Sequence, residues 1–147
     1  MANELSTNVE EVVQYIVINS GDEQFGIDIK YIDNIVRMQH ITRVPKVPCY
    51  FKGVINLRGE VLPVMSLRIK MGVPEGEENK DNRIIIIKMD QHEAIGVIVD
   101  SVKEVVNIDM STVERTSVES GTQFVTGVSK QKDSLISLLD LHAVISE

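Results

Sequence analysis

The side chains best suited to chemistry in this sequence are three histidines, one cysteine and a scatter of carboxylates. His40, His92 and His142 stand far apart in the chain and follow none of the spacings of His/Cys metal sites. We therefore expect all three in loops or on the surface. The only cysteine, Cys49, lies in a segment with neither a Gly-rich turn nor a helix start to activate its thiol, so we expect a packed structural thiol.

Nucleotide and acid–base motifs are also missing from the sequence. Neither G-x-x-x-x-G-K-[ST] nor G-x-G-x-x-G occurs. Asp28 and Asp100 come from related regions of the chain, but solvated carboxylates explain them adequately. A phosphorylation relay would need an acceptor histidine on a long helix, and no segment predicts one. The sequence therefore predicts a protein that is not an enzyme and uses no cofactor or metal.

Composition limits the kind of domain that surrounds these residues. The chain has 147 residues, of which 43% are apolar and 25% charged, enough for one compact domain or two small fused ones. Aromatics are only 4%, so Ile, Val and Leu must build the core, and these residues favour strands. The net charge of −7 argues against nucleic-acid binding. One cysteine, no signal peptide and no membrane-spanning run predict a cytoplasmic protein.

The sequence resembles itself at an offset of about 70 residues. Residues 25–29 match residues 95–99 at an offset of 70, and residues 61–67 match residues 135–141 at an offset of 74. Gly53-Val54 likewise matches Gly127-Val128. We interpret these matches as one duplicated unit. Chance alternation of aliphatic strands is the alternative.

Each copy would hold about five short strands. A sheet of that size protects its edges by curling and closing, so we expect a mostly β protein of two five-stranded β-barrels. The first barrel would span about residues 13–72 and the second about residues 83–139. Residues 73–82, rich in Gly, Glu, Asn and Asp, would form the linker.

Two segments carry helical signals. A short C-terminal helix is expected at about residues 140–146, where Asp140 can act as the N-cap. Whether it packs back on the first barrel is left open. Residues 28–36 carry aliphatic side chains at helical spacing, but the same residues also fit a strand.

The segment from Gly53 to Val64 predicts a tight hairpin. Two aliphatic strands flank Arg58-Gly59, where glycine can supply the positive φ of the turn. Pro63 lacks an amide donor, which predicts an edge strand or a bulge. Arg58 is either the exposed tip of a well-made hairpin or a guanidinium presented to a partner's carboxylate.

This hairpin and its surroundings resemble the CheW family of chemotaxis proteins. The likeness covers Val12 to Ile145 and is carried, in order, by FGIDI (25–29), ITRVP (41–45), GVINLRG (53–59), VLPV (61–64), GVIVD (96–100) and TGV (126–128). It is to a stand-alone CheW domain, because no receiver or kinase segment accompanies it. The resemblance implies two five-stranded barrels packed side by side in a single CheW-like domain of residues 1–147. It also implies a non-enzymatic adaptor, recruited to membrane-associated receptor arrays, that couples chemoreceptors to the histidine kinase CheA.

The resemblance also implies which residues contact these partners. A receptor-binding groove would use Ile29, Ile32, Ile35, Val36, Arg58, Ile98 and Val99. A kinase-binding surface would use Arg43, Val44, Lys52 and Gly53, and a second contact with the kinase regulatory domain would use Val118, Glu119 and Ser120. Ordinary burial in the core is the alternative for Ile29, Ile35 and Ile98.

Two further alternatives stay open at this point. Relatives commonly carry an acidic residue where this chain has Asn34, so Arg58 would be held by Asp33 or Glu60, or would contact the receptor directly. A barrel that binds a small molecule is the competing class of function. It would need convergent polar groups, which the sequence does not indicate.

Overall fold

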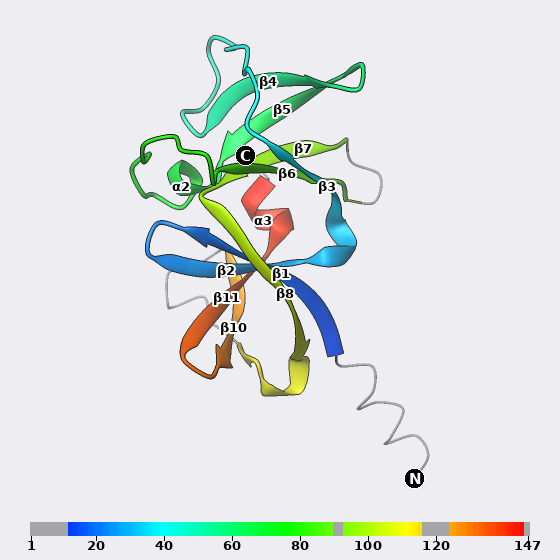
Figure 1. Ribbon diagram of the computed structural model, residues 1–147, viewed down its shortest axis with the longest axis vertical. Coiled ribbons are helices and arrows are strands. Elements are labelled where there is room, and N and C mark those ends of the chain that lie inside the picture. The colour runs from blue at the N-terminus through cyan, green and yellow to red at the C-terminus, as the bar shows by residue number, and fades with distance from the viewer. Residues whose placement is uncertain (1–11, 90–92, 116–123, 146–147) are drawn as a thin grey trace. The chain divides into compact units, whose positions relative to one another are not determined.

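The protein is described by a computed structural model over residues 12–89, 93–115 and 124–145 (Figure 1). The elements are β1 (Val12–Ser20), β2 (Glu23–Asp28), η1 (Ile29–Tyr31), β3 (Ile32–Arg37), β4 (Phe51–Leu57), β5 (Glu60–Ser66), α2 (Leu67–Lys70), β6 (Arg83–Ile87), β7 (Ile95–Val99), β8 (Ser101–Asp109), η2 (Met110–Thr112), β9 (Glu114–Arg115), β10 (Val125–Gln131), β11 (Ser134–Leu139) and α3 (Leu141–Ile145). The predicted mostly β class is confirmed.

The strands form two sheets, one in the order β8-β1-β2-β11-β10-β9 and one in the order β3-β6-β7-β5-β4. The chain also divides into two compact units. Unit 1 takes its described residues from Met1–Ile18, Glu23–Ile29 and Lys103–Glu147, and unit 2 from Asn19–Asp22 and Lys30–Val102. This division differs from the expected sequential barrels, and it puts the expected linker, residues 73–82, inside unit 2. Closure of each sheet into a barrel stays a prediction.

The two sheets share one strand order when repeat-related strands are compared. β1 and β2 of the first copy lie between β8 and β11 of the second, while β6 and β7 of the second copy lie between β3 and β5 of the first. The registers also agree. Gly26 pairs with Leu138 in the parallel β2–β11 pair, and Gly96 pairs with Val64 in the parallel β7–β5 pair. The copies have thus exchanged their first hairpins, which favours duplication over chance and explains the interleaved units.

A repeated glycine lets an extra segment approach each outer strand. Gly53 follows a bulge in β4, and Gly127 follows the equivalent bulge in β10. Gly53 has a φ of 139°, and a Cβ there would overlap the carbonyl oxygen of Thr42. Thr42 exchanges two backbone hydrogen bonds of 2.8 Å with Val54. At Gly127 a Cβ would lie 3.1 Å from the carbonyl oxygen of Glu114, so the same close approach recurs in β9.

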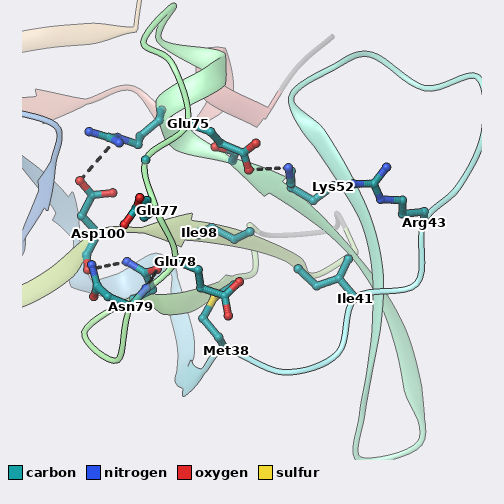
Figure 2. A pocket seen from close by; sticks show the side chains of 14 residues that line it. Met38, Ile41, Arg43, Lys52, Glu75, Glu77, Glu78, Asn79, Ile98 and Asp100 are labelled. Atoms are coloured by element: carbon teal, nitrogen blue, oxygen red, sulfur yellow. Dashed lines mark hydrogen bonds and ion pairs between the residues drawn. The ribbon is translucent and has the colours of Figure 1, made fainter.

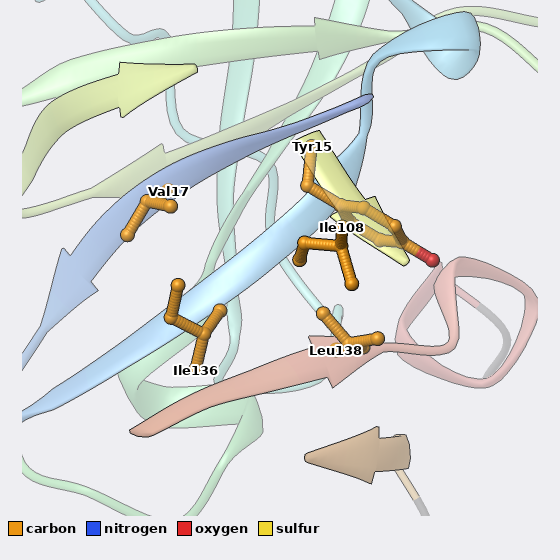
Figure 3. Close-up of a cluster of buried hydrophobic side chains, with 5 residues drawn as sticks. All are labelled: Tyr15, Val17, Ile108, Ile136 and Leu138. Atoms are coloured by element: carbon orange, nitrogen blue, oxygen red, sulfur yellow. The ribbon is translucent and has the colours of Figure 1, made fainter. Parts of the chain in front are cut away.

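Each unit has its own hydrophobic cluster, built mainly from aliphatic side chains. In unit 1 the cluster consists of Tyr15, Val17, Ile108, Ile136 and Leu138 (Figure 3). In unit 2 it consists of Ile55, Leu62, Val64, Ile84 and Ile86. Successive strand residues point to opposite faces, yet all four residues from Ile84 to Ile87 are at most 1% exposed. β6 is therefore buried on both faces, which explains its unbroken isoleucine run.

Asp140 caps the last helix as expected. Its Oδ1 accepts hydrogen bonds from the backbone N–H groups of His142 (3.1 Å) and Ala143 (3.3 Å). The helix itself, α3, spans Leu141–Ile145. In the part of the chain that the structure describes, no helix combines the length and apolarity that a membrane crossing requires.

Two local predictions are resolved by the strand order. The segment that fitted either a helix or a strand is a 3-10 turn, η1, followed by β3. The prediction of an edge strand at Pro63 is wrong, because β5 lies between β7 and β4 and the bulge belongs to β4. Pairing of β5 with β7 begins only at Val64, so the lack of an amide donor at Pro63 is tolerated.

Candidate functional site

An open pocket of about 610 Å³ lies within unit 2 (Figure 2). Its walls come from the segment after β3, from β4, from the end of β7 and from residues 73–82, which we call the acidic loop. The apolar side chains in it are Met38, Ile41 and Ile98, and the charged ones are Arg43, Lys52, Arg68, Glu75, Glu77, Glu78 and Asp100. Figure 2 shows Arg43 and Lys52 together on one side of the pocket, with the acidic loop running along the other.

Most of the cations in this pocket are neutralised by carboxylates of the same unit. Lys52 Nζ forms an ion pair with Glu75 Oε1. Arg68 Nε lies 3.5 Å from Asp100 Oδ2, which also accepts a 2.8 Å hydrogen bond from the backbone N–H of Gly21. The interpretation of Asp100 as a solvated carboxylate is therefore wrong. Arg43 has no ion-pair partner among the residues that the structure describes.

The acidic loop is fastened at both ends. At its start, the N–H of Val73 donates to the carbonyl of Arg68 (2.8 Å). At its end, Asn82 is 9% exposed, accepts from the N–H of Asn79 (2.9 Å) and donates to the carbonyl of Asp100 (3.1 Å). The middle of the loop is exposed, and its only ion pair in the described chain is that of Glu75.

The predicted receptor-groove residues lie on both faces of the unit 2 sheet. Val36 and Ile98 pair with the same residue, Ile84, and so share a face. Their sequence neighbours Ile35 and Val99 point to the opposite face, because side chains alternate along a strand. Val99 is fully buried, whereas the other three are partly exposed.

The remaining groove residues are also separated from one another. Ile29 is half-buried in η1 and belongs to unit 1, while Ile32 begins β3 in unit 2. Arg58 is exposed at the β4–β5 turn with a φ of 52°, followed by Gly59 at 85°. Two successive positive φ values are typical of the type I′ turn. In the described chain Arg58 forms no ion pair with Asp33 or Glu60, the supports considered from the sequence.

The predicted kinase-binding residues are placed differently from one another. Arg43 and Lys52 line the pocket together with Ile98, which the sequence had assigned to the receptor groove. Val44 is 40% exposed in the loop before β4. Gly53 is buried, and its backbone geometry accounts for the glycine there. The second predicted kinase contact, at Val118, Glu119 and Ser120, lies outside the described residues.

The residues first considered for chemistry do not converge. His40 and His142 are exposed, as predicted, and His92 lies outside the described residues. Cys49 is exposed, so the expectation of a packed thiol is wrong, because the chain from residue 42 to residue 49 runs along the surface. The described residues contain no group of three or more His, Cys, Asp or Glu side chains suited to a metal ion.

Sequence reasoning missed the role of the acidic loop in the pocket. Glu75, Glu77 and Glu78 were interpreted as part of a linker between barrels. A dense acidic run in a chain whose charges are otherwise scattered is the signal that could have found it.

Comparison with known proteins identifies the family. The family model of the CheW-like domain matches residues 14–147 of this chain. Chemotaxis protein CheW of Bacillus subtilis is 36% identical over 97% of this chain and 93% of its own length, and that of Helicobacter pylori is 34% identical over 94% and 84%. The crystal structure of the scaffolding protein TtCheW from Thermoanaerobacter tengcongensis superposes with a TM-score of 0.84 at 33% identity, covering 92% of this chain and 93% of that one. The chain therefore belongs to the CheW family.

Proposed function

We propose that this chain is a non-enzymatic adaptor that couples chemoreceptors to a CheA-type histidine kinase. It works in the cytoplasm and is recruited to membrane-associated receptor arrays. Family membership over nearly the whole chain supports this role, as does the likeness in fold to TtCheW, which is a scaffolding protein.

The arrangement of charges in the unit 2 pocket carries the proposal. A catalytic site needs ionisable groups that converge on a shared centre. Here Lys52 pairs with Glu75, and Arg68 pairs with Asp100. The groups that remain are partly exposed apolar side chains, the unpaired Arg43 and the exposed Glu77 and Glu78. Figure 2 shows Arg43 and the two glutamates on different sides of the pocket, an arrangement more typical of a protein-binding surface than of a catalytic centre.

The position of Arg58 gives independent support. A residue other than glycine rarely adopts positive φ, because its Cβ crowds the backbone, at a cost of about 1–2 kcal/mol. Arg58 accepts this conformation at the tip of an exposed hairpin and has no ion-pair partner among the described residues. A strained backbone that carries an exposed guanidinium supports a role for Arg58 in contacting a partner.

The family resemblance and the exposure of each side chain together support a proposal for the contact surfaces. We assign receptor contact to Arg58 and to the partly exposed Ile29, Ile32, Ile35 and Val36, and kinase contact to Arg43, Val44 and Lys52. Ile98, which the resemblance placed in the receptor groove, is assigned to the kinase surface because it lines the same pocket as Arg43 and Lys52. Val99 and Gly53 are buried and support these surfaces by packing. Val118, Glu119 and Ser120 are proposed as the second kinase contact.

A three-component reconstitution tests the proposed function. The purified chain is mixed with a receptor signalling tip and the regulatory domain of a CheA-type kinase, and the mixture is separated by size-exclusion chromatography. We expect receptor and kinase fragments to elute together only when the chain is present. Binding of the chain to neither fragment would contradict the proposal.

A further inference from the structure

We propose that the unit 2 pocket is the docking site for one segment of a partner protein, in which an aliphatic side chain is flanked by a carboxylate and a cation. We further propose that Glu75 occupies the place of the partner's carboxylate until the partner arrives. The inference rests on the proposed function, because Arg43 and Lys52 belong to the proposed kinase-facing surface. The occupant is therefore a segment of the kinase regulatory domain.

The cationic side of the pocket has the chemistry for a carboxylate. Lys52 is 24% exposed and already holds one carboxylate, that of Glu75, which is 49% exposed. Arg43 lies on the same side and has no ion-pair partner in the described chain (Figure 2). A planar guanidinium beside an ammonium favours an incoming carboxylate, because it can bind both oxygens.

The middle of the pocket accepts an aliphatic side chain. Met38, Ile41 and Ile98 are half-buried and pack against the aliphatic cluster of unit 2. Their inner sides are therefore fixed by the core, while their outer sides face the pocket (Figure 2). A preformed apolar patch surrounded by charged groups is the usual centre of a protein interface.

The acidic side of the pocket selects a cation. Glu77 and Glu78 line the pocket and form no ion pair with any described residue. With Arg43 and Lys52 opposite them, they make the pocket dipolar. A partner segment with charges in the matching order is attracted, and one with the reversed order is repelled.

Glu75 differs from its two acidic neighbours because it is satisfied within the chain. The loop that carries it is fastened near Val73 and between Asn79 and Asn82, and Glu75 lies between these fastenings in its exposed part. A partly exposed ion pair is worth only about 0.2–1 kcal/mol, so a partner can displace Glu75 at little cost. Glu75 thus acts as an internal competitor, whereas Glu77 and Glu78 attract the partner.

Neutralising Glu75 in one variant, and Glu77 together with Glu78 in another, tests the inference. The probe is the regulatory domain of a CheA-type kinase, titrated against the full chain by isothermal calorimetry. We expect Glu75→Gln to tighten binding by about two- to fivefold, because it removes the competitor. The double variant Glu77→Gln/Glu78→Gln should weaken binding by a similar factor. A simple field effect of the acidic loop would shift both variants in the same direction.

A variant that lacks Lys52 tests whether the effect of Glu75 depends on their ion pair. Lys52→Gln should weaken binding, and in that background Glu75→Gln should no longer tighten it, because the competitor has lost its site. If the wild-type chain binds the kinase domain but Glu75→Gln does not tighten binding while Glu77→Gln/Glu78→Gln weakens it, this inference is overturned. The adaptor role would still stand. If the two variants change the affinity for a receptor tip in opposite directions, but not the affinity for the kinase domain, the choice of partner is wrong. Binding to neither protein overturns both proposals.

Discussion

At the residue scale, Arg58 combines an exposed side chain with a backbone of positive φ, as Lys46 also does. Its side chain is exposed, and its backbone has a φ of 52°, a conformation that glycine adopts far more easily. Asn56 supports the turn by accepting a hydrogen bond from the N–H of Gly59 (3.2 Å). The turn itself would tolerate glycine at position 58, so a change to glycine there tests the side chain without disrupting the turn.

Replacing Arg58 separates these two properties. We expect Arg58→Glu to weaken binding of the receptor tip or the kinase domain by more than about 1 kcal/mol while leaving the chain folded. Arg58→Gly is the matched control, because it removes the charge but relieves the backbone. It should weaken binding and also raise the free energy of unfolding by up to about 1 kcal/mol. Calorimetric titration and urea unfolding measure the two effects. Unchanged binding by folded variants would rule out Arg58 as a contact.

Asp109 provides a test of local electrostatics in unit 1. A hydrogen bond from the Ser111 hydroxyl (2.6 Å) and another from its backbone N–H (3.0 Å) lower the pKa of the Asp109 carboxyl from its ordinary value of 3.8. Both bonds stabilise the ionised form. The associated stability is therefore present above pH 3.8 and is lost as the pH falls through the lowered pKa.

We expect Ser111→Ala to raise the pKa of Asp109 toward its ordinary value, because the hydroxyl bond is the larger cause. The measurement is an NMR titration of the Asp109 side-chain carbon. The unsubstituted chain, titrated under the same conditions, is the control. An unchanged Asp109 titration would show that the hydroxyl bond does not form in solution.

At the element scale, two glycines of the β4–β5 hairpin differ in how closely other atoms approach them. Gly53 lies in the bulged strand β4, and Gly59 lies in the turn. Both have positive φ, 139° and 85° respectively. A Cβ at Gly53 would overlap the backbone of Thr42, whereas nothing lies within 4 Å of a Cβ at Gly59. The two positions therefore separate conformational strain from overlap.

We expect Gly53→Ala to lower the free energy of unfolding by at least about 3 kcal/mol, because strain and overlap add. Gly59→Ala should lower it by only about 1–2 kcal/mol, because strain acts alone. Urea unfolding followed by circular dichroism measures both variants. Equal losses would mean that the segment at Thr42 moves aside and that the close approach contributes little.

Sequence patterns predicted elements that depend on neighbouring residues. The cap at Asp140, the turn at Gly59 and the duplicated strands are all local features, and the structure contains each of them. The prediction failed at Pro63 because strand position in a sheet depends on distant partners. The ion pair of Glu75 with Lys52 also joins distant segments, so the acidic run could indicate a charged surface but not the residues that lie opposite it.

At the scale of the whole molecule, the exchange of hairpins between copies could not be predicted from the sequence for the same reason. An offset of about 70 residues is equally compatible with two sequential barrels and with two sheets that share strands. Pairings between the copies, such as that of Gly26 with Leu138 and that of Gly96 with Val64, distinguish these arrangements. The family resemblance and the mostly β class were recoverable from the sequence because neither requires that pairing.

The exchange predicts that neither half of the chain folds alone. Fragments 1–72 and 73–147 should each give the NMR spectrum of an unfolded chain, because each lacks central strands of its sheet, and mixing them should restore dispersed signals. As a control, a protease site inserted into the acidic loop and cut after folding should leave the spectrum of the intact chain. A cooperative unfolding transition in either isolated fragment would contradict the prediction.

The parallel pairing of β2 with β11 has a consequence for biosynthesis. β2 leaves the ribosome well before β11, the strand with which it pairs. Until β11 is made, the nascent polypeptide therefore carries an edge without its neighbour, the kind of surface that aggregates or recruits chaperones. A premature stop codon just before β11 would consequently leave β2 without one of its neighbours, although β2 itself is still translated.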